Sequence, residues 1–269
     1  ELQKERGMSH VYITSNGKAY GERLKKQQSL TDSALKKRRE YLLDNSIKNQ
    51  LPNGSLVLKD VALLQGIRLS VNKLSISPNN VISYYSKFND RLINMVFSAI
   101  ERPIEAKVNN LLQSYYHVTK AKEYAGIERA LLAEQYNNNQ EKSYFIESTR
   151  AKEALHLELF YKLSDNIMRE HYQLMIMHDS FEKVDRQRRT LNKENSSTWF
   201  DDATQRINQF QKIETKSVNQ ILMELESVKQ ASQNKFWFSA AYGSVSIIFT
   251  LVLLFQVIKQ FTLDKKQKI

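Results

Sequence analysis

Hydrophobic residues recur along the chain at three- and four-residue steps, which is the spacing of one face of an α-helix. Leu56, Val61, Leu64, Ile67 and Val71 form one such stripe. No segment shows the alternation of β-branched residues between Gly, Asn or Pro that predicts a strand. Only 7 Gly and 3 Pro residues interrupt the pattern. We therefore predict an all-α fold.

Turn signals divide this pattern into helices. The first helix is expected through "LQKERGMSHVYI", ending at "TSNGKAYG", and the second is expected to end near "LPNGS". Ser77 is a candidate N-cap, and Pro78 fits the first turn of the next helix because its missing N–H would have no partner there. Pro103 starts another long helix, which "NNN" at 137–139 ends or interrupts. A further helical stretch is expected to about residue 193.

The last helical pattern is the longest. Ser196, Ser197 and Thr198 are candidate caps, and apolar residues recur after them at three- and four-residue steps. No Gly or Pro lies between Trp199 and Phe236. We expect one unbroken helix there, a rod with a rise of about 1.5 Å per residue that could carry a conformational signal.

Residues 236–258, "FWFSAAYGSVSIIFTLVLLFQVI", form a 23-residue stretch without a charged side chain. A bilayer core takes about 20 apolar residues in helical form, so this segment is long enough to span it with some tilt. Trp237 and Tyr242 lie toward its front end, where aromatic rings favour the membrane interface. A buried core helix is the alternative, but soluble cores rarely contain so long an uncharged run. We predict a transmembrane helix in contact with the lipid bilayer.

The residues after this segment, 259–269, are rich in lysine. Positive flanks tend to stay on the cytoplasmic side of a membrane. We therefore predict three parts: an outer domain at 1–235, the membrane helix at 236–258, and a short cytoplasmic tail. The chain begins at Glu1 without a methionine or signal peptide, so we expect an upstream segment to have been removed or left out.

The composition narrows the function only slightly. Lys and Arg number 40 against 29 Asp and Glu, a formal net charge of +11. Such an excess can attract anions, or it can be the solvated surface of long helices. The basic clusters at 36–40 and 185–189 lack the interleaved aromatic residues of a single-strand binding surface, so we predict no nucleic-acid partner. The absence of cysteine excludes disulfides and thiol chemistry.

The usual catalytic motifs are missing from the sequence. It contains no Gly-rich phosphate loop, no His-Glu-x-x-His zinc helix and no Gly-x-Ser-x-Gly elbow. His171 and His178 are seven residues apart and could share a helix face, but no third metal ligand is evident. We predict a protein that is not an enzyme and that has no metal site and no cofactor.

The chain contains two Glu–Arg pairs, each close to a glycine: Glu5–Arg6 with Gly7, and Glu128–Arg129 with Gly126. Glycine leaves room for a close helix approach, which would remove a guanidinium partly from water. A buried charge needs partners, because an unpaired one costs several kcal/mol. One interpretation is a salt bridge to a carboxylate. The other is that arginines from separate helices converge on a small anion, since the planar guanidinium donates paired N–H groups to planar oxyanions.

Five segments in order resemble the nitrate- and nitrite-sensing (NIT) domain, a helical input module of bacterial receptors. They are "LQKERGMS", "LTDSAL", "GIRLSVNKLSISPNNVISYYSKFNDRLI", "KEYAGIERALL" and "STWFDDATQRINQF". The resemblance runs from Glu1 to about Val228. It implies two antiparallel four-helix bundles side by side, followed here by the single transmembrane helix, with the ligand between the bundles and held by arginines. The resemblance also implies the inner membrane of a bacterium, with residues 1–235 on the periplasmic side.

The resemblance implies four ligand-binding residues: Arg6 in the ERG motif, Arg129 in the GIERA motif, Arg206 in the WF-x-x-x-T-x-R motif and Arg68 in the IRLSV motif. One position departs from the family. Members commonly have Gln-Arg before the Thr-Asp of the second motif, where this chain reads "QQSLTD". This departure bears on the specificity of the pocket for nitrate.

These observations predict a membrane-anchored receptor input domain that binds nitrate or nitrite and passes a signal through its C-terminal helix. We expect it to form a homodimer or to associate with a signalling partner. Two alternatives stay open. One is a membrane-anchored helical scaffold or adaptor that has kept the fold and no longer binds an anion. The other is an input domain for a different small anion.

Overall fold

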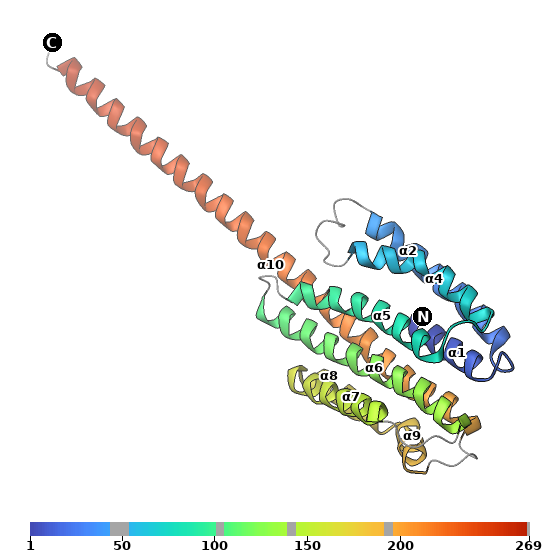
Figure 1. Cartoon of the computed structure of the whole chain (residues 1–269). Coiled ribbons are helices and arrows are strands. Elements are labelled where there is room, and N and C mark those ends of the chain that lie inside the picture. Colours follow the sequence, from blue (N-terminus) through green and yellow to red (C-terminus); the bar gives the residue numbers. More distant parts are fainter. Residues whose placement is uncertain (44–53, 101–104, 139–143, 191–195, 268–269) are drawn as a thin grey trace. The chain divides into compact units, whose positions relative to one another are not determined.

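The computed structural model describes residues 1–43, 54–100, 105–138, 144–190 and 196–267, and in the last helix it describes side chains up to residue 250. Its helices are α1 (Leu2–Thr14), α2 (Gly21–Leu43), α4 (Gly54–Asn72), α5 (Pro78–Ile100), α6 (Ala106–Asn138), α7 (Tyr144–Leu163), α8 (Asn166–Ile176), α9 (Asp179–Arg189) and α10 (Ser196–Gln267). These described segments contain no strand (Figure 1). The all-α prediction is confirmed.

Two predicted helix boundaries are confirmed in detail. Helix α5 begins at Pro78, and the Ser77 hydroxyl accepts a hydrogen bond from the Asn80 N–H at 3.2 Å. Helix α1 ends at Thr14, and Gly17 in the following turn has a φ of +75°, a conformation that glycine adopts without strain. The predicted helix end near "LPNGS", the start at Pro103 and the last Asn of "NNN" lie outside the described residues.

The helical stretch expected up to residue 193 is divided into α7, α8 and α9. A carboxylate oxygen of Asp165 accepts a hydrogen bond from the Met168 N–H at 2.9 Å and so begins α8. The His178 Nδ1 accepts one from the Ser180 N–H at 3.2 Å and begins α9. Each side chain satisfies an N–H that has no partner inside the new helix. The spacing of apolar residues does not predict such breaks. Residues 191–193 of the expected stretch lie outside the described residues.

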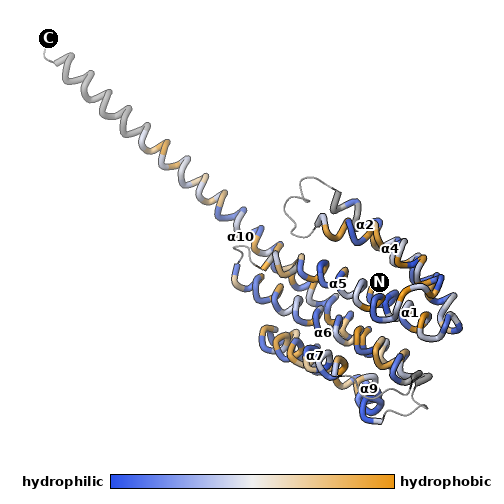
Figure 2. The backbone as a smooth tube through the Cα atoms, viewed as in Figure 1, coloured by the Kyte–Doolittle hydropathy of each residue, from blue (hydrophilic) through white to orange (hydrophobic). Residues whose placement is uncertain are grey.

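Two groups of helices, which we name the first and second bundles, surround separate cores. In the first bundle, α1, α2, α4 and α5 contact one another. Their apolar faces meet in a core that includes Leu24, Val57, Leu64, Tyr85 and Phe88. Hydrophobic and hydrophilic residues are interleaved along each of these helices (Figure 2), which is the pattern of amphipathic helices packed around a core.

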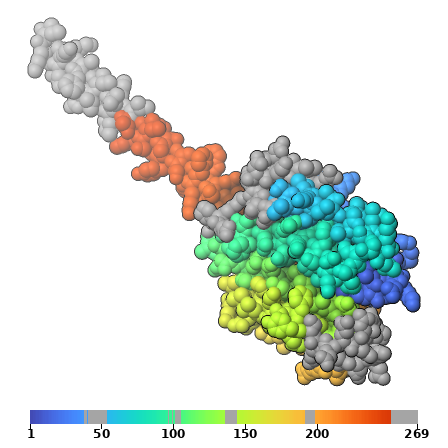
Figure 3. Space-filling model, in the orientation of Figure 1, coloured from blue at the N-terminus to red at the C-terminus, as the bar shows by residue number. Residues whose placement is uncertain are grey.

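The second bundle consists of α6, α7, α8, α9 and the first part of α10. Its core includes Val118, Phe160, Met168, Phe181 and Phe210, which come from all five helices. Both α1 and α5 contact α6, so the two bundles meet along α6. Figure 3 shows the segments of the first bundle beside those of the second on one face. The four arginines predicted to bind the ligand lie in helices of the two bundles: Arg6 in α1, Arg68 in α4, Arg129 in α6 and Arg206 in α10.

The chain divides into two compact units, Glu1–Ile221 and Leu222–Ile269. The first unit contains both bundles and lies within the predicted outer domain at 1–235. Helix α10 spans Ser196–Gln267, so the prediction of an unbroken helix from Trp199 to Phe236 is confirmed.

Over the residues that the structure describes, no helix is both long enough and apolar enough to cross a bilayer. The membrane helix at 236–258 therefore stays a prediction from the sequence. The side chains of its second part, from residue 251 onward, lie outside the described residues.

Candidate functional site

The two Glu–Arg pairs meet where α1 packs against α6. A Cβ atom built on Gly7 of α1 would lie 2.7 Å from an Nη atom of Arg129 on α6. A Cβ atom built on Gly126 of α6 would lie 2.8 Å from an Nη atom of Arg6 on α1. Each arginine therefore covers the glycine of the opposite helix, and a side chain at either glycine would collide with it. The close helix approach predicted from the two glycines is confirmed.

The glutamates of the two pairs make their contacts within their own bundles. Both carboxylate oxygens of Glu5 accept hydrogen bonds from Arg68, at 2.7 and 2.9 Å, and one also accepts from the Tyr85 hydroxyl at 2.7 Å. Glu128 accepts from Arg150 at 2.5 Å and from Arg188 at 2.9 and 2.5 Å. In each Glu–Arg pair, the glutamate therefore binds side chains of its own bundle. The arginine instead contacts the opposite helix, α6 for Arg6 and α1 for Arg129.

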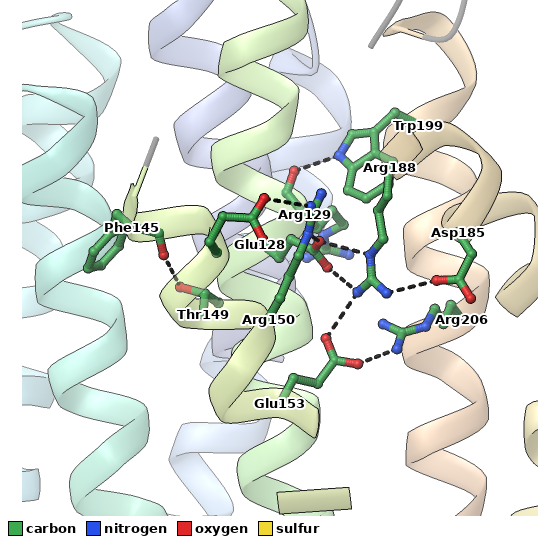
Figure 4. A network of polar contacts seen from close by, with 11 residues as sticks. Glu128, Arg129, Phe145, Thr149, Arg150, Glu153, Asp185, Arg188, Trp199 and Arg206 are labelled. Atoms are coloured by element: carbon green, nitrogen blue, oxygen red, sulfur yellow. Dashed lines mark hydrogen bonds and ion pairs between the residues drawn. The ribbon is translucent and has the colours of Figure 1, made fainter. Parts of the chain in front are cut away.

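Figure 4 shows the network around Glu128. Arg188 also donates to Glu153 at 3.2 Å, and Glu153 in turn accepts from Arg206. Burial by itself would raise the pKa of Glu128, but the charges and hydrogen bonds of Arg188 and Arg150 lower it overall. The network joins α6, α7, α9 and α10 through buried ions.

Arg6 is fully buried and has a carboxylate partner. Its Nη1 donates to the Glu123 carboxylate and, at 2.8 Å, to the Ser86 hydroxyl. The amide of Gln3 donates to the other oxygen of Glu123 at 2.7 Å. The charge of Arg6 is therefore balanced within the protein.

Arg129 is only 2% exposed, and its hydrogen-bond partners are neutral. Its guanidinium donates to the Thr204 hydroxyl at 2.8 Å and to the Gln3 carbonyl at 3.1 Å, and it lies 4.5 Å above the centre of the Phe200 ring. Within the described part of the chain, no carboxylate forms a salt bridge with Arg129, and its buried Nε has no hydrogen-bond partner. Burial, followed by the nearby charge of Arg6, lowers the pKa of Arg129 to about 9.

A cavity of about 50 Å³ lies beside Arg129. Its walls come from α1, α6 and α10, and its lining residues are Glu1, Gln3, Lys4, Lys122, Gly126, Arg129, Ile207 and Gln211. Lys122 forms an ion pair with Glu214 of α10. Cavities that hold drug-sized organic ligands measure about 300 Å³ or more, so this one has room only for water or a small ion.

The other two predicted site arginines lie in different surroundings. Arg68 binds Glu5 and, at 2.7 Å, Asp32, and it also donates to the Gln28 carbonyl at 3.2 Å. Burial alone would lower the pKa of Arg68, but the bonds and charges of Glu5 and Asp32 raise it. Arg206 binds Glu153 and lies 4.7 Å from the centre of the Phe181 ring. The structure thus brings Arg6 and Arg129 together, and it places Arg6, Arg68 and Arg206 in ion pairs.

Sequence reasoning missed several residues around Arg129. Gln3, Glu123, Thr204 and Gln211 contact the two arginines or line the cavity. A signal for one of them was present, since Glu123 lies one helical turn before Gly126 in the motif "KEYAGIERA". Thr204 lies inside the WF-x-x-x-T-x-R motif, two residues before the arginine that was selected.

His171 and His178, whose spacing would allow them to share one helix face, belong to different elements. His171 lies in α8 and contacts Lys216, whereas His178 caps α9. Among the described residues, no group of three or more His, Cys, Asp or Glu side chains could hold a metal ion.

The fold and the arginine centre define an all-α domain of two bundles with a buried positive charge beside a small cavity. A family model described as "Nitrate and nitrite sensing" (NIT) matches residues 1–222, and the chain belongs to this family.

One solved structure, described as "Structure of the NasR transcription antiterminator", is similar to this chain with a TM-score of 0.75 at 19% sequence identity. The likeness covers 84% of this chain and 65% of that one, and at this identity it shows the fold alone. No curated protein matches the chain.

Proposed function

We propose that Arg129, together with Arg6, binds nitrate or nitrite in the cavity between α1, α6 and α10. The observation that carries this proposal is the buried guanidinium of Arg129, which has no carboxylate partner among the described residues and lies beside a cavity of about 50 Å³. A buried charge without a counter-ion is unfavourable, so an anion that enters the cavity would supply the counter-ion that Arg129 lacks among the described residues. The protein is a sensor and not an enzyme.

The hydrogen-bonding capacity of Arg129 supports a planar oxyanion. A guanidinium has five N–H donors. Thr204 and the Gln3 carbonyl accept from two of its nitrogens, and Nε is left without a partner. The remaining donors lie in one plane and can form the paired contacts that suit a planar anion better than a single lysine charge would. Lys4 and Lys122 also line the cavity, where they pair with Glu1 and Glu214, so Arg129 is the lining cation without a carboxylate partner among the described residues.

Helix α10 forms part of the wall, which supports a role in signal transmission. Thr204 of α10 holds Arg129, and Ile207 and Gln211 line the cavity. An anion bound there would contact α10 directly. Anion binding can shift the equilibrium between two arrangements of the protein only by the difference in anion affinity between them. Contacts between the anion and α10 would provide such a difference if α10 is placed differently in the two arrangements. We propose that α10 passes the signal on toward its C-terminal end.

The charge-free segment at 236–258 supports the further proposal of a membrane anchor, with the first unit on the periplasmic side of a bacterial inner membrane. Extraction of membranes with carbonate tests it: a chain anchored by a helix stays in the membrane pellet. Release into the supernatant would contradict the anchor and leave the anion site untouched.

The anion proposal is tested on the purified full chain by calorimetry and thermal unfolding with nitrate, nitrite, chloride and sulfate at constant ionic strength. We expect saturable binding of nitrate or nitrite only. Arg129→Lys should abolish it, because a lysine cannot present paired N–H groups.

Arg186→Lys is the matched control. Arg186 is an exposed arginine of α9 that pairs with Glu182, and its replacement should leave binding unchanged. Equal, weak effects of all four anions, unaltered by Arg129→Lys, would contradict the proposal and favour a scaffold that has kept the fold. Selective binding of another oxyanion would assign the site to that anion.

A further inference from the structure

The structure contains a carboxylate that already occupies one of the two site arginines. Glu123 is 2% exposed, and one of its carboxylate oxygens binds Nη1 of Arg6. The other oxygen accepts from the Gln3 amide. A carboxylate is itself a planar oxyanion, so it competes with nitrate for the Nη1 donor of Arg6.

Gln3 connects this carboxylate to Arg129. Its side chain holds Glu123, while its main-chain carbonyl accepts from Arg129. Arg6 also lies close to the cavity. The cavity wall includes Gly126, and Nη2 of Arg6 lies 2.8 Å from a Cβ atom built on this glycine. The Glu123 carboxylate accepts from Nη1 of Arg6, and the main-chain carbonyl of Glu123 accepts from Nη2 at 3.4 Å, so an anion that bridges Arg6 and Arg129 would have to share a guanidinium that Glu123 already holds.

The charges of Arg6, Arg129 and Glu123 also indicate competition between the carboxylate and an incoming anion. Arg6 and Arg129 contribute two positive charges, and Glu123 contributes one negative charge. The carboxylate thus weakens the attraction available to an incoming anion, and in a buried site this attraction is little screened by salt. Glu123 also acts on Arg129 at a distance, where its charge stabilises the protonated guanidinium.

We propose that Glu123 is a built-in competitor of the anion: its carboxylate holds Arg6 in the ligand-free protein and must leave Arg6 when an anion bridges the two arginines. This inference rests on the proposed function and adds to it the residue that sets the affinity. The Glu123 carboxylate makes the affinity for the anion lower than the two arginines alone would give. The sensor would therefore respond at higher anion concentrations.

The test is nitrate binding by the full chain with Glu123→Gln. The amide keeps the shape of the side chain and removes the charge, so Kd should fall about tenfold, which corresponds to about 1.4 kcal/mol. Glu123→Asp keeps the charge but withdraws the carboxylate by one methylene, and it should lower Kd in the same direction by a smaller factor. This second variant also serves if Glu123→Gln does not fold.

Glu153→Gln is the matched control, since Glu153 is a buried glutamate paired with Arg206 and does not line the cavity. Its Kd should equal that of the unaltered chain. The nitrate affinity, read beside the melting temperature, is the discriminating readout. Loss of the Glu123 charge lowers the melting temperature in either case, but a purely structural role would also lower the affinity, whereas a competitor raises it.

Unchanged or weaker binding in both Glu123 variants, with nitrate still bound by the unaltered chain, would overturn this inference and leave the proposed function intact. Absence of binding in the unaltered chain and in every variant would overturn the proposed function itself. Binding that appears only after Glu123 is altered would support the competitor.

Discussion

The guanidinium of Arg129 lies directly on Gly7, so that a Cβ atom at Gly7 would be 2.7 Å from Nη2 and 3.2 Å from the Phe200 ring. Arg129 cannot move aside freely, because Thr204 and the Gln3 carbonyl hold it. We predict that Gly7→Ala lowers the free energy of unfolding by about 1–3 kcal/mol, the range for an overpacked core. Urea denaturation measures the change.

Gly66 in α4 supplies the control for this prediction, because a Cβ atom built there meets nothing within 4 Å. Gly66→Ala should stabilise the chain by about 0.5–1 kcal/mol, since alanine favours an exposed helix position. If Gly7→Ala proved as harmless as Gly66→Ala, the close approach of α1 and α6 would be wrong.

The two kinds of buried arginine should respond differently to replacement by methionine. Arg129→Met removes a charge that has no carboxylate partner in the described segments, so the free energy of unfolding should change by less than about 1 kcal/mol or rise. Arg68→Met strands the fully buried carboxylate of Glu5 and should cost about 3–5 kcal/mol. Thermal and urea unfolding of both variants provide the comparison, and equal losses would show that Arg129 has a counter-ion after all.

Glu128 should contribute to stability in a defined range of pH. Its pKa is lowered in the folded protein, so the unfolded chain binds its proton first as the pH falls. The contribution is fully present above about pH 4.5 and is lost as the pH falls through the folded pKa. We predict that Glu128→Gln is destabilising at pH 7 and that its unfolding free energy depends less on pH below 4.5. An unaltered acid dependence in the variant would contradict this assignment.

A pair of histidines between α6 and α7 gives a second pH window. Nδ1 of His117 lies 2.8 Å from Nδ1 of His156, and the ring of His156 stacks on Tyr124. Burial and then the charges of His117 and Lys120 lower the pKa of His156 to about 4. The unfolded chain therefore binds more protons between about pH 6.5 and 4, so stability falls as the pH is lowered through this range.

His156→Phe should keep the stacking on Tyr124 and flatten the fall in melting temperature between pH 6.5 and 4. Replacement of His171 of α8, which is half-buried and contacts Lys216, by glutamine is the control and should leave the fall unchanged. If both variants behaved like the unaltered chain, His156 would not be the group that titrates in this window.

Much of the candidate site could be predicted from the sequence. The sequence predicts Arg6 and Arg129 because each belongs to a motif with a nearby glycine. In the structure each arginine lies against the glycine of the opposite helix, Arg129 against Gly7 and Arg6 against Gly126. The resemblance also predicts Arg68 and Arg206 as site residues, and these two, like Arg6, lie in ion pairs with glutamates. A motif records which residue type is present at a position. It does not record whether a carboxylate from a distant helix reaches that residue.

The sequence by itself determined the local structure: the all-α fold, the helix start at Pro78 and the unbroken helix from Trp199. These depend on backbone preferences, capping side chains and apolar spacing, which act over a few neighbouring residues. Only the tertiary structure decided that Arg6 has Glu123 as its partner while Arg129 has no carboxylate within the described residues. Both arginines follow a glutamate in sequence, so the difference between them arises from which side chains the packing of α1, α6 and α10 brings within hydrogen-bond distance.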